Sequence, residues 1–264
     1  MRNNVKYNLC LTVKKNTVSV WAHRGSGTLA PENTLEAFIR TADLGTDGIE
    51  FDAVLSSDGM AVISHDRRVR DPKTGNTRKI RFMTYTEIKS LGKTIAGGLP
   101  VGCGSVAGTD PIFFPTAEEV FSALSPTSLT LNVELKDHSA RLCEICARAA
   151  ERFGMTERVI YSSFSPAALW RMKKACPAAR TALLVRFLPF PFGIFDGIGI
   201  SAVHIPVCCA LRYPRTVEKL HAKNMSVAVW TANSAEDISR ASEIGADAII
   251  TDDPVLALRL LGRK

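Results

Sequence analysis

Short apolar runs alternate with longer amphipathic stretches along the chain from residue 18 almost to its end. The apolar runs are rich in Val, Ile and Leu, and each has the length of one buried strand. The stretches between them repeat their apolar positions at the spacing of a helix that covers a sheet with one face. This alternation predicts repeated strand–helix–strand units and therefore an α/β fold with a parallel sheet.

The pattern predicts strands over residues 18–22, 48–54, 61–64, 128–134, 158–162, 180–185, 202–205, 226–231 and 248–251. It predicts helices over residues 32–44, 117–124, 140–153, 166–175, 214–223, 235–244 and 254–260. Two helix starts carry their own signals. Ser165 precedes Pro166, which suits the first helical position, and Ser234 precedes an acidic first turn that suits the helix dipole.

One segment, residues 67–115, interrupts the alternation. It is too long for an ordinary loop between a strand and a helix, and it is basic and rich in glycine. We therefore expect an insertion over one end of the sheet. The rest of the 264-residue chain has the length of one α/β barrel domain. We expect an N-terminal extension over residues 1–17 and a single domain over 18–264, with no internal repeat.

The net charge of +7 is concentrated in this segment. Between Asp66 and Thr94 there are nine basic and three acidic residues. Two interpretations stay open: a patch that attracts an anionic substrate or an acidic membrane surface, or a solvated insertion without a ligand. No recognised nucleic-acid motif accompanies the charge, so we expect no nucleic-acid partner.

The seven cysteines are odd in number and scattered, which is no disulfide framework. Cys143 and Cys146 lie at helical spacing in a predicted amphipathic helix, and this argues against a redox or zinc site. Near the N-terminus Lys14 and Lys15 interrupt the apolar segment, and residues 183–211, the most apolar region, contain charges and prolines. We predict neither a signal peptide nor a spanning helix, and expect a cytoplasmic enzyme with reduced thiols.

Two carboxylates, Glu50 and Asp52, stand two residues apart in a predicted strand. Side chains at this spacing project from the same face. Burial of both would be costly without a cation between them, and oxygen ligands favour Mg²⁺ or Ca²⁺ over zinc. The alternative is an exposed edge strand with solvated acids, against which the apolar neighbours Ile49 and Phe51 argue.

Glu134 and Lys136 repeat this arrangement at the end of another predicted strand. Glu134 adds a third carboxylate to the predicted metal site. Lys136 beside it can neutralise a phosphate oxygen, while the metal polarises the same phosphate. The alternative interpretation is an ion pair on the surface.

Two histidines, His23 and His65, each end a predicted strand. Active sites of parallel barrels are built at such positions. An imidazole titrates near neutral pH, so one ring can accept a proton from a nucleophile while the other donates one to a leaving alkoxide, as phosphodiester hydrolysis requires. A structural role is the alternative for either residue taken alone.

Taken in order, the segments His-Arg, PENT, Glu-x-Asp, DG, His-Asp, ELK and IITDDP resemble the glycerophosphodiester phosphodiesterase family, in particular its bacterial cytosolic branch. The resemblance covers residues 18–260. It implies a (β/α)₈ TIM barrel with a family-specific insertion after the second histidine. It also implies that His23 and His65 form the acid/base pair and that Glu50, Asp52 and Glu134 hold a divalent metal.

The resemblance further implies that Arg24 and Lys136 contact the phosphate and that Trp230 packs against the glycerol group. The implied reaction is metal-dependent hydrolysis of a small-molecule glycerophosphodiester to glycerol 3-phosphate and an alcohol, with direct attack by water and a cyclic phosphate intermediate both open. The insertion departs from the family pattern, which leaves the head group undetermined. His204, at another strand end, is interpreted as structural.

Two other functions are kept as alternatives. The first is a lysophospholipase D acting on membrane lysolipids, with peripheral membrane contact through the basic insertion and the phenylalanines at 187, 190, 192 and 195. The second is a binding barrel without catalysis. The sequence leaves the oligomeric state open.

Overall fold

A closed barrel of eight parallel strands forms the centre of the protein. The computed structural model describes residues 18–96, 113–189 and 197–263. Within the sheet each strand pairs with its neighbours, and β1 pairs with both β11 and β2, which closes the ring. The predicted (β/α)₈ TIM barrel is therefore confirmed. Its strands are β1 (Ser19–His23), β2 (Gly48–Leu55), β6 (Thr130–Leu135), β7 (Val159–Ser163), β8 (Arg180–Leu184), β9 (Ala202–Pro206), β10 (Ser226–Trp230) and β11 (Ala248–Thr251).

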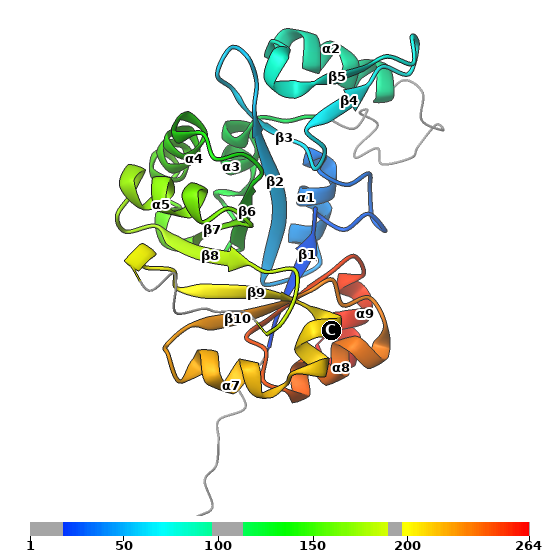
Figure 1. The fold of residues 1–264 in the computed structure, drawn as a ribbon. Coiled ribbons are helices and arrows are strands. Elements are labelled where there is room, and N and C mark those ends of the chain that lie inside the picture. The colour runs from blue at the N-terminus through cyan, green and yellow to red at the C-terminus, as the bar shows by residue number, and fades with distance from the viewer. Residues whose placement is uncertain (1–17, 97–112, 190–196, 264) are drawn as a thin grey trace, which may run out of the picture.

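Helices surround this barrel on its outer side (Figure 1). All seven predicted helices are present, and the predicted cap residues Ser165 and Ser234 each accept a hydrogen bond from a backbone N–H of the first turn. The short α6, which follows Pro206, was not predicted. The helices are α1 (Leu35–Asp43), α3 (Ala117–Leu124), α4 (Ala140–Arg152), α5 (Pro166–Ala175), α6 (Val207–Arg212), α7 (Arg215–His221), α8 (Ala235–Glu243) and α9 (Pro254–Leu260), with the 3₁₀ turn η2 (Thr156–Arg158) before β7.

The apolar core has two layers, because successive strand residues face opposite sides of the sheet. The barrel interior contains Trp21, two isoleucines and four alanines, one each from β8, β9, β10 and β11. The indole leaves no room for a side chain at Gly48, where a Cβ atom would lie 2.8 Å from Trp21 Cδ1. The outward-facing residues, among them Phe51, pack against the helices.

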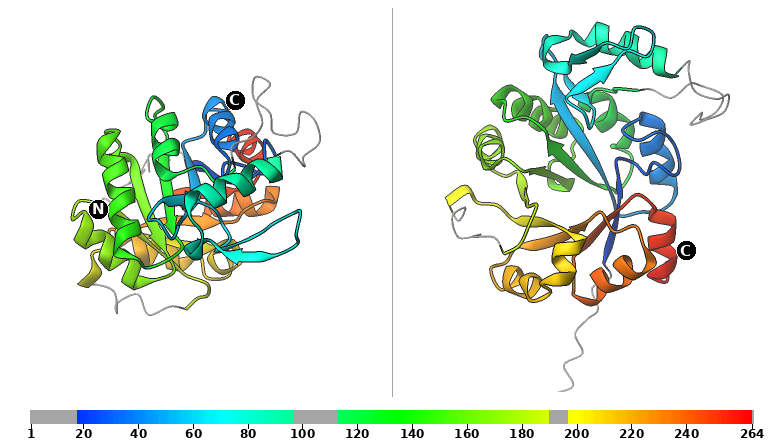
Figure 2. Two further views of the ribbon diagram at one scale, coloured as in Figure 1. Left: turned by 90° about the horizontal axis from the view of Figure 1, so that it is seen from above. Right: turned by 45° about the vertical axis from the view of Figure 1, so that its right-hand side comes forward.

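The one predicted strand that is not part of the barrel, β3 (Ala61–Ile63), pairs antiparallel with β2. The connection from β2 is a turn of only a few residues, too short for the crossover that a parallel pair needs. Three elements that were not predicted follow: the hairpin of β4 (Arg68–Arg70) and β5 (Thr77–Lys79), the 3₁₀ turn η1 (Ile80–Phe82) and α2 (Tyr85–Ala96). Figures 1 and 2 show them beyond the end of β2, apart from the ring of helices.

This inserted unit is attached to the barrel by its own small apolar cluster. Val54 of β2 and Val62 of β3 pack with four apolar residues of the insertion, Val69, Ile80, Met83 and Ile88. The two ends of the insertion also meet, since the Ile63 N–H donates to the Pro115 carbonyl at 2.8 Å. Over the part of the chain that the structure describes, no helix combines the length and the apolar character needed to cross a membrane.

Candidate active site

A cavity of about 940 Å³ opens at the carboxyl ends of the barrel strands. One side of it is formed by strand ends and the loops after them, and the other by the start of the insertion. The structure thus brings together side chains that are up to 227 positions apart, from His23 to Ile250. Of the eight predicted site residues, seven line this cavity: His23, Arg24, Glu50, His65, Glu134, Lys136 and Trp230.

The eighth, Asp52, lies beneath the cavity as part of a buried cluster with Glu50 and Glu134. Each of the three offers a carboxylate oxygen, and these atoms lie within 4.8 Å of one another. The cause is the register of the sheet: Asp52 pairs directly with Glu134, and Glu50 projects from the same face of β2. Phe51 between them faces outward into the helix layer.

Lys136 holds two of these carboxylates. Its Nζ lies 2.8 Å from Asp52 Oδ1 and 2.8 Å from Glu134 Oε1. Asn33 Nδ2 donates to the other Asp52 oxygen at 2.9 Å. Burial alone would raise the pKa of Asp52, but the Lys136 ammonium and these hydrogen bonds lower it below its usual value. The pKa of Glu134 is raised, by burial first and by the charge of Asp52 second.

Glu50 has the least compensation of the three. It accepts a hydrogen bond from the backbone N–H of Arg24 at 3.1 Å, and burial together with the charge of Asp52 raises its pKa to about 8. With all three buried carboxylates ionised, the cluster would carry one more negative charge than Lys136 and Arg24 balance, and the raised pKa of Glu50 reflects this excess. One further cation among their oxygens would remove this excess, and an all-oxygen donor set suits a hard divalent ion. The residues present thus fit the metal site that the sequence predicts.

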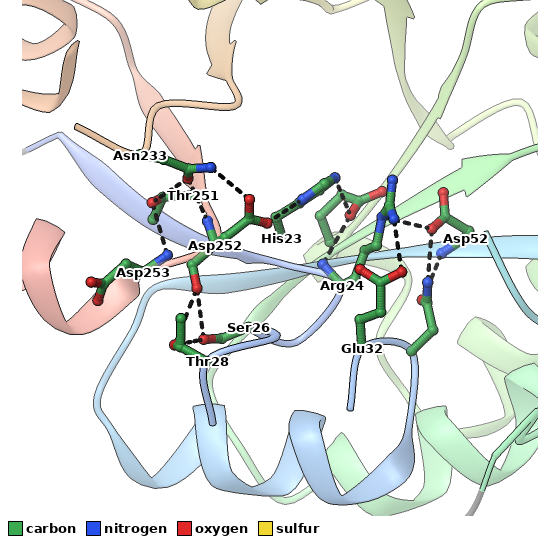
Figure 3. Close-up of polar contacts among 12 residues, drawn as sticks. His23, Arg24, Ser26, Thr28, Glu32, Asp52, Asn233, Thr251, Asp252 and Asp253 are labelled. Atoms are coloured by element: carbon green, nitrogen blue, oxygen red, sulfur yellow. Dashed lines mark hydrogen bonds and ion pairs between the residues drawn. The ribbon is translucent and has the colours of Figure 1, made fainter. Parts of the chain in front are cut away.

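His23 lies beside this cluster, and Asp252 contacts the ring nitrogen that does not face Glu50 (Figure 3). Its Nδ1 lies 2.6 Å from Asp252 Oδ1, and its Nε2 lies 3.9 Å from Glu50 Oε2. Burial would lower the pKa of His23, but the hydrogen bond to Asp252 and the charge of Glu50 raise it overall. Asp252 is itself fixed by Asn233 Nδ2 at 2.6 Å.

The turn after His23 directs Arg24 back over the carboxylates. Arg24 has a φ of 53°, in the left-handed region that few residues other than glycine adopt. Gly25 follows with a φ of 78°, and a Cβ atom there would lie 2.6 Å from Phe38 Cδ1. The guanidinium lies 2.9 Å from Glu32 and 3.6 Å from Asp52, so the turn adds a cation above the cluster.

His65 comes from the side of the insertion, two residues after β3, and is more open to solvent than His23. Its side chain is 40% exposed, and Nδ1 lies 3.0 Å from Asp66 Oδ1. Trp230 ends β10 and contacts the edge of Phe164 with ring centroids 5.8 Å apart. Its buried Nε1–H has no hydrogen-bond partner among the described residues, so it remains able to donate to a bound molecule.

Several polar groups of the site were missed in the sequence. Asp252 directly follows β11, so the strand-end rule that identified His23 also identifies this residue. Asn132 stands two positions before Glu134 on the same face of β6. Over the described residues Asn132 Oδ1 and Ser162 Oγ are buried without hydrogen-bond partners, and both residues line the cavity, where they can contact a ligand.

His204 does not reach this cavity. It lies inside the barrel with its ring centroid 6.0 Å from that of Trp21, and burial lowers its pKa to about 3. Neither ring nitrogen has a hydrogen-bond partner in the described part of the chain. At neutral pH the ring is therefore an uncharged part of the barrel core.

Comparison with known proteins places this barrel among phosphodiesterases. A glycerophosphodiester phosphodiesterase of Caldanaerobacter subterraneus subsp. tengcongensis is 33% identical over 246 residues, which cover 92% of this chain and 97% of that protein. A crystal structure of a candidate glycerophosphoryl diester phosphodiesterase from Silicibacter pomeroyi matches with a TM-score of 0.79 and 27% identity, covering 93% of each chain.

A phosphodiesterase from Oleispira antarctica, solved in complex with the product sn-glycerol-3-phosphate, shares the fold with a TM-score of 0.74 at 24% identity, covering 92% of this chain and 96% of that one. Residues 23–256 match the glycerophosphoryl diester phosphodiesterase family, a span that runs from the first histidine of the cavity into the last helix. The chain belongs to the glycerophosphoryl diester phosphodiesterase family.

Proposed function

We propose that this protein hydrolyses glycerophosphodiesters to glycerol 3-phosphate and an alcohol. The observation that carries the proposal is the opening of one cavity onto two imidazoles, His23 and His65, and a buried carboxylate cluster, in a chain that belongs to this family. Membership of the family and the relative named for this activity support the class of reaction. The contacts of the individual side chains support the roles that follow.

Glu50, Asp52 and Glu134 would hold a divalent metal ion, either Mg²⁺ or Ca²⁺. Such an ion polarises the phosphate and stabilises negative charge as the phosphorus–oxygen bond to the alcohol breaks. Lys136, already drawn in by two of these carboxylates, lies where it can neutralise a non-bridging phosphate oxygen. Arg24 would contact the same phosphate from the turn above.

His23 and His65 would transfer the protons. One ring accepts the proton of the nucleophile, either water or the 2-hydroxyl of the glycerol, and the other protonates the departing alkoxide, so the alcohol leaves. Attack by water gives glycerol 3-phosphate directly, whereas attack by the 2-hydroxyl gives a cyclic phosphate, which water then opens to glycerol 3-phosphate. Asp252 acts on the reaction through His23, whose ring it orients by the bond to Nδ1. Trp230 would pack against the glycerol group beside Phe164.

The test is release of glycerol 3-phosphate from a panel of glycerophosphodiesters, with and without a metal chelator. We expect release that stops on chelation. His23→Ala and His65→Ala should each reduce kcat by about a hundredfold or more, because each removes one of the proton-transfer groups. His221→Ala is the matched control, since His221 bonds to Asp247 on the surface and does not line the cavity. Turnover near the wild-type rate in either active-site variant contradicts the assignment.

The two alternatives have less support. The membrane lysolipid substrate depends on the basic insertion together with four phenylalanines, of which Phe187 is exposed and the other three lie outside the described residues. A binding barrel without catalysis leaves the buried carboxylates and both histidines of the cavity without a use. We therefore propose a water-soluble diester as the substrate and treat the insertion as a segment whose first described residues, from Arg67 to Arg70, border the site.

A further inference from the structure

The outer wall of the cavity is strongly basic. Arg67, Arg68 and Arg70 reach it from the insertion, and Arg186 reaches it from the loop after β8. Val69 of β4 is buried while Arg68 and Arg70 on either side are exposed, so both guanidinium groups extend from one face of this strand. The hairpin therefore turns a pair of arginines toward the site.

Most cations deeper in the cavity already have partners. Arg24 pairs with Glu32 and Asp52, and Lys136 pairs with two carboxylates. Arg67 donates to the backbone carbonyl of Lys136. The acidic residue of the outer wall, Asp66, contacts His65.

The remaining three cations, Arg68, Arg70 and Arg186, form what we call the arginine wall. Among the residues that the structure describes, none of the three has an ion pair with a carboxylate. A single phosphodiester carries one negative charge, and the deeper cations already lie where it would bind. The arginine wall thus provides positive charge in addition to that of the cations beside the scissile phosphate.

One aromatic ring of the cavity, Phe164, has a face covered by one of these cations. Arg186 Cζ lies 4.1 Å from the centre of the Phe164 ring, whose edge meets Trp230. Open aromatic faces are the surface by which proteins bind a quaternary ammonium group such as that of choline. Here a guanidinium occupies the face of Phe164, so a cationic head group would meet a like charge in place of an open ring.

Resting on the proposed function, we propose that the arginine wall is a subsite for an anionic head group. The preferred substrates are then glycerophosphodiesters whose alcohol carries a second phosphate or a carboxylate. The scissile phosphate lies over the carboxylate cluster, and the second anion extends toward the insertion. Arginine suits this role because its planar guanidinium binds either anion through two parallel hydrogen bonds.

The experiment compares kcat/KM for substrates that differ in head-group charge. The substrate with a neutral head group is glycerophosphoglycerol, those with an anionic head group are its terminal phosphate ester and glycerophosphoglycerate, whose alcohol is glyceric acid, and the one with a cationic head group is glycerophosphocholine. The wild-type enzyme should prefer the phosphate ester over the neutral diester. Arg68→Gln and Arg70→Gln should each lower kcat/KM for the phosphate ester about tenfold and change that for the neutral diester less than about threefold.

Arg81→Gln is the matched control. Arg81 is an exposed arginine of the same insertion that stacks on Phe82 and does not line the cavity. This variant should keep the wild-type preference. Loss of activity on glycerophosphoglycerate as well as on the phosphate ester shows a general anion subsite, and loss on the phosphate ester alone shows a phosphate subsite; both support the proposal.

Equal loss on the neutral and anionic substrates, or no loss in Arg68→Gln and Arg70→Gln, overturns it. So does an unchanged substrate preference combined with reduced sedimentation with vesicles of phosphatidylglycerol and phosphatidylcholine, which assigns the arginines to a membrane surface. These outcomes differ from failure of the proposed function, because in that case the wild-type enzyme hydrolyses none of the four diesters.

Discussion

The inner and outer halves of the cavity differ in whether their charged side chains have partners of opposite charge. In the inner half Asp52 and Glu134 are buried at paired positions of neighbouring strands, and Lys136 Nζ lies within hydrogen-bond distance of both. In the outer half Arg68 and Arg70 are exposed on an insertion and have no carboxylate partner among the described residues. The inner charges are positioned by the barrel itself, and the outer ones by a segment outside it.

This difference separates two tasks. Buried, mutually paired groups are costly to change, because removing one member leaves a desolvated charge without a partner. Exposed arginines on a hairpin can be changed with little effect on folding. The inner half is thus suited to the reaction that every substrate undergoes, and the outer half to the choice among substrates. The predictions below test this division, from the largest expected effect to the smallest.

The largest effect is expected at the carboxylate cluster. Glu134→Gln removes one oxygen ligand of the proposed metal and one partner of Lys136, so we expect kcat to fall about a thousandfold, roughly 4 kcal/mol of transition-state stabilisation. Calorimetric titration with Mg²⁺ and Ca²⁺ should show weaker binding. Glu118→Gln is the control, since Glu118 pairs with Arg152 on the outer surface. A Glu134→Gln enzyme with the metal affinity and kcat of the wild-type enzyme contradicts the assignment of the reaction to the inner half.

A smaller loss is expected when His23 is retained and its support is removed. Asp252→Asn takes away the carboxylate that orients the ring, so kcat should fall about a hundredfold while KM stays within about twofold. Steady-state kinetics on glycerophosphoglycerol give both values. Asp43→Asn, at the exposed end of α1, is the control and should leave both unchanged. A rise in KM at constant kcat shows that Asp252 serves binding and not the orientation of His23.

The ring of His204, in the barrel interior below the site, should make the protein less stable in acid. His204 has a pKa of about 3 in the folded protein against 6.5 for an unperturbed ring, so the unfolded chain binds one proton more between these values. The contribution of His204 to the free energy of unfolding is fully present above pH 6.5 and decreases as the pH falls toward 3, by about 2 kcal/mol at pH 5. Urea unfolding at pH 7 and pH 5 measures it.

His204→Gln should remove this part of the pH dependence, and His221→Gln, which changes a half-exposed histidine, should retain it. Equal pH dependence in the wild-type protein and His204→Gln shows that the ring is accessible to protons in the folded state. The inner half would then be less isolated from solvent than its burial indicates.

The smallest effect is expected at the arginine wall. Arg70→Gln should change the free energy of unfolding by no more than about 0.5 kcal/mol, because its side chain is exposed. Asp52→Ala should cost about 3–5 kcal/mol, because Lys136 loses a buried partner. Chemical unfolding of both variants under one condition compares the halves directly. Similar changes in the free energy of unfolding for the two variants would show that the inner and outer halves do not differ in their effect on stability.

The barrel and the inner half of its cavity could be predicted from sequence because their signals are local. Glu50 and Asp52 alternate with apolar residues on one strand, and Glu134 with Lys136 repeats the pattern, so the period of a strand places all four on one face. The end of β11 marks the position of Asp252, but its role depends on a contact with His23, 229 positions away, which no local pattern contains.

The insertion was harder to predict for a different reason. In Arg68–Arg70 a single apolar residue stands between two arginines, too short a run to indicate a strand. The helix Tyr85–Ala96 did carry a signal: Thr84 and Glu87 exchange hydrogen bonds as a capping box, and their spacing could have identified the helix start. Which arginines face the cavity depends on how the hairpin packs on Val54 and Val62, and this is tertiary information.

The place where the insertion joins the barrel has a practical consequence. Its first and last residues are held side by side by the bond between Ile63 and Pro115 and the bridge between Val62 and Thr116, while the eight strands close without it. Residues 67–114, which follow His65, can therefore be exchanged for the corresponding segment of a relative without shifting the register of any barrel strand. A chimaera of this kind would transplant substrate preference onto an unaltered reaction centre.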